Sequence, residues 1–361
     1  MKKATIVTLN GYFNYGNRLQ NFALQEALKK YNLEVDTLRI TRTPKKERLK
    51  PFLRNVRDYV KAPSKYKLEK KRNEVFTSFS HKYITEQSEE YFLGDDLTFL
   101  NEQTDYFIAG SDQVWNPNMN KVSSKYFLQF ANPDKRITYS PSFGVGELSS
   151  SVAEKYKKWI EGIPYLSVRE NEGAKLIKQL TNRDAEVLVD PTMLLTREEW
   201  LEIAKEANNK PKGNYILTYF LGGIPEKHQK NIYNLSKQYS MPIINLGDIK
   251  EEETYKTGPS EFIDYINDSS IFFTDSFHGV VFSILLDTPF VVYERVTSSS
   301  TMYSRIETIL DKFDLREREE KNIDFSTDIL TVDYTHTLPV LAKEKEQSDN
   351  FLRNALKLNN E

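Results

Sequence analysis

Short apolar runs alternate with amphipathic helical segments along most of this chain, and this alternation constrains its fold more than any other feature. The N-terminal part is an example. An apolar strand is predicted over residues 4–9, followed by a loop rich in Gly and Asn, a helix over about residues 18–30 and a second strand over residues 34–38. Strands joined through a helix in this order favour a parallel sheet. The sequence therefore predicts an α/β fold from its N-terminal residues onwards.

The alternation continues to the C-terminal region. Further strands are predicted at residues 106–109, 136–140, 165–168, 186–189, 215–221, 242–246, 271–275 and 290–293. Helices are predicted near residues 152–160, 173–180, 226–239, 260–267, 279–286 and 302–313. A chain of 361 residues exceeds what a single core usually organises. We expect two Rossmann-like doubly wound domains facing each other across a cleft, over residues 1–195 and 196–340, with a helix in 341–361 packing back on the N-terminal domain.

Composition excludes several classes of protein. The chain has no cysteine and four scattered histidines, so we expect no disulfide, no metal site and no cysteine nucleophile. No run approaches the roughly 18 apolar residues of a membrane span, and the start lacks a signal peptide, which predicts a cytoplasmic protein. The net charge of −2 gives no indication of a nucleic-acid partner.

The one strongly charged region is a basic insertion over residues 39–72, which carries fourteen Lys or Arg residues against three acidic residues. Such a segment suits peripheral contact with the anionic inner face of a membrane, or with a polyanionic acceptor. The alternative is a solvated helix and loop, which is what most charged runs are.

Two loops that follow predicted strands carry polar side chains suited to a sugar or a phosphate. The first contains Asn14, Tyr15, Gly16, Asn17 and Arg18, where glycine permits a tight path and Asn and Arg supply donors. This loop can also be structural, because Asn and Gly are ordinary turn residues.

The second loop contains Ser111, Asp112, Gln113 and Trp115. Hydroxyl groups of a sugar bind Asp and Gln, and its C–H faces pack on Trp. The alternative is a turn or helix cap made by Ser111 or Asp112 beside a core Trp115.

Charged residues at three later strand ends complete the candidate site. Arg169 ends the strand 165–168 and can present its guanidinium to a carboxylate or phosphate, or pair with a neighbouring acid. His278 lies at a predicted helix N-terminus after an apolar strand, a position that disfavours the imidazolium until an anion binds there. Arg295 and Arg305 flank a hydroxyl-rich loop that suits a donor phosphate.

These segments together resemble the polysaccharide pyruvyl transferase family. The likeness rests on Asn14-Tyr15-Gly16 with the helix that follows, Gly110 to Trp115, Ser167 to Glu170, Val189 to Thr192 and Thr274-Asp275-Ser276-Phe277-His278-Gly279. The resemblance implies a glycosyltransferase B-like fold and metal-independent transfer of a pyruvate ketal from phosphoenolpyruvate to a sugar or lipid-linked saccharide of a bacterial capsule or exopolysaccharide. It also implies that the catalytic Arg and His fall on Arg169 and His278.

One position departs from the family pattern. Several members have an Arg two residues before the His, where this chain has Ser276, so Arg295 or Arg305 is expected to contact the donor instead. We expect His278 to protonate the donor, and Asp112 or Asp275 to accept the hydroxyl proton. Two other functions stay open: a glycosyltransferase that uses a nucleotide sugar, and a carbohydrate-binding protein without catalysis.

Overall fold

The computed structural model describes residues 1–41, 62–118, 122–295 and 303–358 of the chain, which forms two compact units. Unit 1 comprises the described parts of residues 1–57, 80–195 and 342–361, and unit 2 those of 58–79 and 196–341. The basic insertion was expected in the N-terminal domain. Its described C-terminal part instead begins helix α3 (Pro63–Tyr83), most of which belongs to unit 2, and residues 42–61 lie outside the described residues.

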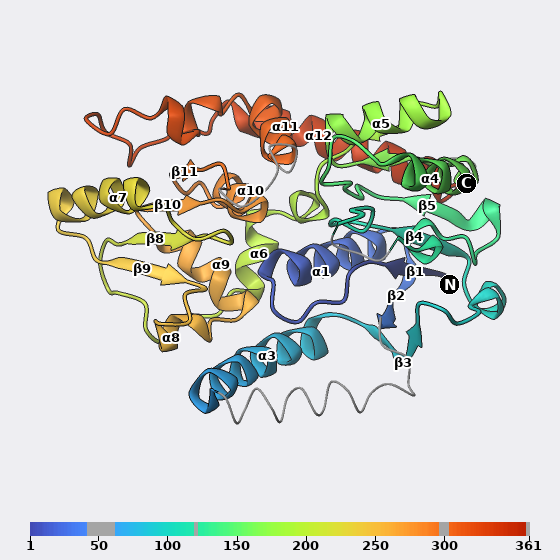
Figure 1. The fold of residues 1–361 in the computed structure, drawn as a ribbon, viewed down its shortest axis with the longest axis horizontal. Coiled ribbons are helices and arrows are strands. Elements are labelled where there is room, and N and C mark those ends of the chain that lie inside the picture. Colours follow the sequence, from blue (N-terminus) through green and yellow to red (C-terminus); the bar gives the residue numbers. More distant parts are fainter. Residues whose placement is uncertain (42–61, 119–121, 296–302, 359–361) are drawn as a thin grey trace. The chain divides into compact units, whose positions relative to one another are not determined.

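The sheet of unit 1 has five parallel strands in the order β3-β2-β1-β4-β5 (Figure 1). They are β1 (Lys2–Val7), β2 (Leu33–Thr41), β3 (Glu86–Phe92), β4 (Tyr106–Ala109) and β5 (Arg136–Thr138). From β1 the chain builds outwards first through β2 and β3, and then on the other side through β4 and β5. The strand order therefore reverses between β1 and β4, the position where open α/β sheets bind ligands.

Both faces of this sheet are covered, which is why the inner strand β4 is buried and apolar along its whole length and β1 is buried from Ala4 to Val7. Ala4 and Ile6 of β1 face a core made with α1 (Tyr15–Lys29) and the C-terminal helix α12 (Thr337–Ala355). Val7 faces the opposite core, to which α4 (Ser150–Glu161) and α5 (Asn171–Thr181) contribute. A short parallel pair, β6 (Ser167–Val168) and β7 (Glu186–Val187), continues this part of the chain.

The sheet of unit 2 has four parallel strands in the order β11-β10-β8-β9. They are β8 (Ile216–Tyr219), β9 (Ile243–Leu246), β10 (Ile271–Thr274) and β11 (Phe290–Val292). Helix α7 (Glu226–Tyr239) packs on the face that carries Ile271 and Phe273, while α9 (Pro259–Asp268) and α10 (Phe277–Leu285) pack on the face of Phe272. In this unit the strand order reverses between β8 and β10.

The sequence did not predict strand β3 or the one-turn helix α8 (Glu252–Tyr255), and it offered a helix in the region of α3 only as an alternative. Strand β3 contains Glu86, Glu89 and Glu90 and lies at the edge of its sheet, so it lacks the apolar pattern by which strands are recognised. The remaining helices are α6 (Arg197–Ile203) and α11 (Ser304–Phe313), with short 3-10 turns at Thr98–Glu102, Ser124–Phe127, Pro133–Lys135, Pro191–Leu194, Arg316–Arg318 and Glu320–Asn322. Within the described ranges, no helix has both the length and the apolar character needed to cross a bilayer.

Candidate active site

The loop after β1 and the loop after β4 meet where the strand order of unit 1 reverses. Asn14 caps α1, because its side-chain oxygen accepts a hydrogen bond from the backbone N–H of Asn17 at 3.1 Å. Asn17 in turn donates from Nδ2 to Oδ2 of Asp112 at 2.8 Å. The start of α1 is thereby fixed to the loop after β4.

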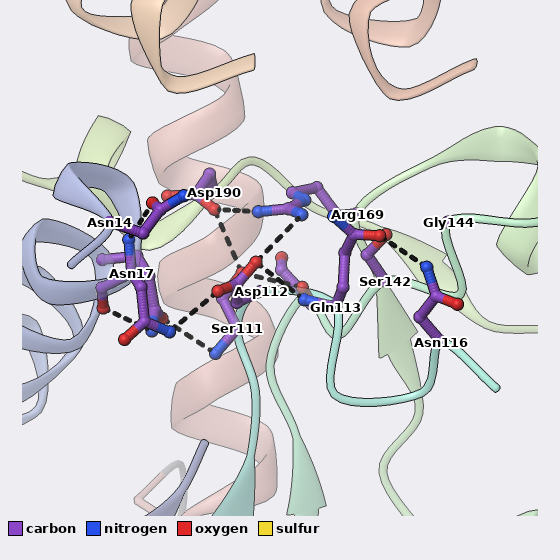
Figure 2. A network of polar contacts seen from close by, with 12 residues as sticks. Asn14, Asn17, Ser111, Asp112, Gln113, Asn116, Ser142, Gly144, Arg169 and Asp190 are labelled. Carbon is purple, nitrogen blue, oxygen red and sulfur yellow. Dashed lines mark hydrogen bonds and ion pairs between the residues drawn. The ribbon is translucent and has the colours of Figure 1, made fainter. Parts of the chain in front are cut away.

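A buried ion pair continues this network, as Figure 2 shows. Arg169 Nη1 lies 2.7 Å from Asp190 Oδ2, and its Nη2 lies 4.0 Å from Asp112 Oδ1. Asp190 also accepts hydrogen bonds from the hydroxyls of Ser111 and Thr192. The side chains of Arg169 and Asp190 are 1% and 0% exposed, whereas that of Asp112 is 15% exposed. The charges at this position are paired with one another, and Asp112 is the acid that reaches solvent.

Two aromatic residues predicted to contact a sugar are core residues instead. Trp115 is 0% exposed and stacks on Phe127 at 4.8 Å between ring centres, while its indole N–H donates to the carbonyl of Tyr126. Tyr15 is also 0% exposed, in the first turn of α1 beside the buried Gly16. Trp115 is therefore a core residue, which was the alternative to sugar contact, and neither ring exposes a face to a ligand.

Arg18 was predicted to bind substrate, and it too is fully buried. Its guanidinium lies 2.8 Å from Glu86 of β3 and also donates to Asn17 Oδ1 and to the carbonyl of Leu9. Tyr12 donates to the same Glu86, and burial together with that carboxylate raises the pKa of Tyr12 to about 12. Arg18 thus holds Asn17 and the loop in place rather than contacting a ligand.

The other predicted residues of the second loop are turn-forming groups. Ser111 is 0% exposed and donates to Asp190 and to the carbonyl of Ser140, and Gln113 accepts from Asn116. Gly110 precedes them with a φ of +126°, and a Cβ there would lie 2.1 Å from the carbonyl oxygen of Tyr139. A glycine is required at this position because the backbone of the neighbouring strand end fills the space.

In unit 2 the loop after β8 meets the end of β10 at the corresponding position. The carboxylate of Asp275 accepts hydrogen bonds from the backbone N–H groups of Leu221 at 2.7 Å and Gly222 at 2.9 Å. Arg295 Nε lies 3.1 Å from the same carboxylate. The Asp275 side chain is 2% exposed, so this acid fixes the loop and the arginine more readily than it accepts a proton from substrate.

His278 lies in the first turn of α10, as the sequence predicted. Ser276 caps this helix by accepting a hydrogen bond from the N–H of Gly279 at 3.3 Å. The helix approaches β10 so closely that a Cβ on Gly279 would lie 2.7 Å from Oγ1 of Thr274. His278 is 8% exposed and packs edge-to-face with Phe277. The free N–H groups and the dipole of a helix start make this a suitable place for an anion.

Two arginines accompany His278 in unit 2. Arg295, whose side chain is 19% exposed, is oriented by Asp275, and Arg305 lies with its Cζ 6.0 Å from the ring centre of Phe277. From the sequence, one or other of these arginines was expected to contact the donor, because Ser276 stands where the family pattern has an Arg. Arg169, the other residue expected to be catalytic, belongs to unit 1, whereas His278 belongs to unit 2.

Sequence reasoning missed Glu86, the role of Asp190 and the amides of Leu221 and Gly222. Asp190 had a signal, because an Asp-Pro-Thr sequence directly follows a predicted strand. Glu86 and the two backbone amides had no such signal. A polar edge strand lacks a recognisable side-chain pattern, and backbone N–H groups are the same in every residue but proline. Within the described part of the chain, no three His, Asp or Glu side chains gather closely enough to hold a metal ion.

Two solved structures with a similar fold are UDP-N-acetylglucosamine 2-epimerases, one of them putative. A putative UDP-N-acetylglucosamine 2-epimerase from Listeria monocytogenes has a TM-score of 0.50 at 10% identity, covering 97% of each chain. The UDP-GlcNAc 2-epimerase of Methanocaldococcus jannaschii, solved with UDP-GlcNAc and UDP, has a TM-score of 0.53 at 13% identity, covering 98% of this chain and 100% of that chain. At such identities the likeness establishes the fold, and it confirms Rossmann-like domains of the glycosyltransferase B type.

The family itself follows from the sequence profile. No curated protein sequence gives a significant match to the chain. The profile of the polysaccharide pyruvyl transferase family, in contrast, matches residues 14–295, a range that includes Asn14, Asp112, Arg169, Asp190 and His278. That range covers most of the chain and extends through both units, and so the protein belongs to the polysaccharide pyruvyl transferase family.

Proposed function

We propose that this protein transfers a pyruvyl group from phosphoenolpyruvate to two hydroxyl groups of one sugar, which forms a cyclic ketal on a cell-surface polysaccharide or its precursor. The observation that carries the proposal is the family match over residues 14–295 together with His278 at the N-terminus of α10. An imidazole at a helix start can hold a proton beside a bound anion, and phosphoenolpyruvate is an anion that must be protonated on carbon to react.

In this mechanism His278 is the general acid. It gives a proton to the methylene carbon of the donor, and the adjacent carbon acquires oxocarbenium character. The first sugar hydroxyl bonds to that carbon, the bond to the phosphate oxygen breaks, and the second hydroxyl closes the ketal ring. One hydroxyl proton restores His278, and the other leaves with phosphate.

The anionic groups of the donor are assigned to unit 2. Arg295 and Arg305 lie with His278 in that unit, and Asp275 orients Arg295 through an N–O distance of 3.1 Å. An arginine fork suits both carboxylate and phosphate oxygens. Asp275 is therefore a positioning residue in this proposal. Of the two acids expected to accept a hydroxyl proton, Asp112 is the more exposed.

Arg169 receives a positioning role instead of donor contact. Its guanidinium is 1% exposed and lies 2.7 Å from Asp190. Phosphoenolpyruvate therefore has no direct access to this guanidinium. The guanidinium also lies 4.0 Å from Asp112 and in this way helps to fix the loop after β4. The reaction takes place in the cytoplasm in this proposal, and contact of the basic insertion with a membrane stays a prediction.

The experiment is a phosphate-release assay with phosphoenolpyruvate and an array of saccharide acceptors, with mass spectrometry to detect the mass of pyruvate minus water on the sugar. His278→Gln is expected to lower the rate by roughly 10²- to 10⁴-fold, the usual contribution of a general acid. The exposed His81 supplies a matched control, and His81→Gln is expected to leave the rate unchanged. Full activity of His278→Gln would refute the assignment.

A glycosyl transfer from a nucleotide sugar is the second candidate, since the similar epimerase fold was solved with UDP-GlcNAc. Thermal unfolding in the presence of phosphoenolpyruvate or of UDP-sugars separates the two functions, because only the true donor raises the midpoint at saturating concentration. Stabilisation by a UDP-sugar and not by phosphoenolpyruvate would favour the second candidate.

A further inference from the structure

A cavity of about 1150 Å³ lies at the carboxyl ends of β8 and β9 in unit 2. Phe220 and Gly223 line it from the loop after β8, and Gly247 and Asp248 from the loop after β9. Helix α7 contributes its first turns, and α3 contributes Lys65 and Glu69 from the basic insertion. The cavity is larger than the roughly 300–1,000 Å³ that a small ligand usually occupies, so it has room for several joined sugar units.

The charges around the cavity disfavour a phosphate or a nucleotide. Among the described residues that line it, the acids are Glu69, Glu226, Asp248 and Glu251, and the bases are Lys65, Lys230 and Lys250, without an arginine. Glu226 occupies the first turn of α7, where a bound phosphate would otherwise interact with the helix N-terminus. Burial, reinforced by the charge of Asp248, raises the pKa of Glu251. The lining thus has four acids against three lysines, and an anionic ligand would add to that excess of negative charge.

The remaining groups suit a neutral sugar. Gln229 and Asn245 offer amides, and Tyr233 and Tyr255 offer aromatic rings. A cation orders each ring, since Lys237 Nζ lies 4.5 Å from the centre of the Tyr233 ring and Arg72 Cζ lies 4.9 Å from that of Tyr255. Amides and carboxylates bind hydroxyl groups, while an ordered ring packs against the C–H face of a sugar.

One loop connects this cavity to the proposed donor site. Phe220 and Gly223 line the cavity, and the amides of Leu221 and Gly222 between them hold Asp275, the residue that orients Arg295. A saccharide in the cavity therefore lies against the segment that also fixes the donor residues.

We propose that the cavity between the ends of β8 and β9 binds the uncharged saccharide chain of the acceptor, with Tyr233 as a stacking residue. This inference rests on the proposed function, which requires a saccharide acceptor. In this proposal the saccharide of the acceptor binds to unit 2, and Lys65 and Glu69 at the start of α3 help to recognise it.

The test measures binding of an array of neutral di- to tetrasaccharides to the full-length protein, followed by steady-state kinetics with each saccharide that binds. Tyr233→Ala is expected to weaken saccharide binding and to raise the acceptor KM by about tenfold or more, the loss expected for one stacked ring. The KM for phosphoenolpyruvate is expected to stay unchanged. Tyr233 is 53% exposed, so the fold does not depend on its ring.

Two variants serve as controls. Tyr239 lies on the same helix α7, is 38% exposed and does not line the cavity, so Tyr239→Ala is expected to bind as the wild type does. Tyr233→Phe retains the ring and is expected to retain most of the affinity.

The outcomes separate this inference from the proposed function. Saccharide binding that depends on Tyr233, without any phosphoenolpyruvate-dependent transfer, would refute the function and support the cavity assignment. Transfer with an acceptor KM that Tyr233→Ala leaves unchanged would refute the cavity assignment alone. Tyr233-dependent binding of UDP, or no binding of any saccharide in the array, would also overturn it.

Discussion

Unit 1 and unit 2 each place polar loops where the strand order of a parallel sheet reverses, but the two clusters use their charges differently. In unit 1 the Arg169 and Asp190 side chains are 1% and 0% exposed and neutralise each other. In unit 2 a carboxylate held by two backbone amides orients Arg295, which is 19% exposed, beside a helix start that carries His278. The point where the strand order reverses thus holds a buried structural ion pair in unit 1 and a candidate binding site in unit 2.

The largest expected effect concerns the ion pair of unit 1. Arg169→Ala leaves the buried carboxylate of Asp190 without its cation, so we expect the free energy of unfolding to fall by about 3–5 kcal/mol in a urea titration. Arg353→Ala is the control, because Arg353 pairs with Asp349 in the same unit while both side chains are more than 40% exposed. Loss of activity in Arg169→Ala with unchanged stability would show instead that Arg169 contacts substrate.

An intermediate effect is expected for the carboxylate of unit 2. Asp275→Asn replaces one acceptor oxygen by an N–H₂ group that faces a backbone N–H, at an expected cost of about 1–3 kcal/mol in unfolding free energy. The KM for phosphoenolpyruvate should rise as well, because Arg295 loses its charged partner. Asp287→Asn, at an exposed pair with Arg197, should change neither quantity. An unaltered donor KM in Asp275→Asn would place the donor away from this cluster.

A smaller effect is expected at the start of α10. Ser276→Ala removes the cap of the helix, and we expect a loss of about 1 kcal/mol in unfolding free energy. Ser276→Thr keeps a hydroxyl in place and should retain most of that stability. If the alanine variant loses activity far beyond its loss of stability, Ser276 also contacts the ligand.

The smallest effect concerns an exposed Arg–Asp pair in unit 2, the counterpart of the buried pair in unit 1. The hydrogen bond from Arg316 lowers the pKa of Asp311, so this acid contributes stability above its unfolded pKa and loses it as the pH falls through the folded value. Because the Asp311 side chain is 55% exposed, we expect a contribution of only a few tenths of a kcal/mol. Wild type and Asp311→Asn should therefore differ slightly at pH 7 and converge in thermal unfolding as the pH falls below the lowered pKa of Asp311. A persistent difference at low pH would indicate another cause.

Much of the fold could be predicted from sequence because apolar strands buried on both faces are continuous runs of Val, Ile, Phe and Leu. Strand β4 and helix α7 begin and end at the predicted residues, 106–109 and 226–239. Strand β3 was missed because an edge strand need not be apolar. The start of α3 was expected in the N-terminal domain but belongs to unit 2, because charge content does not reveal which unit a helix packs against.

The sequence by itself determined the two alternating α/β series and the position of His278 at a helix start, since each depends on residues that are near one another in the chain. It also determined the family, because the matching segments follow one another in order over residues 14–295 whatever their contacts in space. Only the tertiary structure decided that Trp115 and Tyr15 are core residues, that Arg18 and Arg169 are paired with acids distant in sequence, and that a cavity lies beside the loop after β8. The physical reason is that burial and pairing depend on which segments fold against each other. A loop of Asn, Asp, Trp and Arg looks the same in sequence whether those side chains face a ligand or one another.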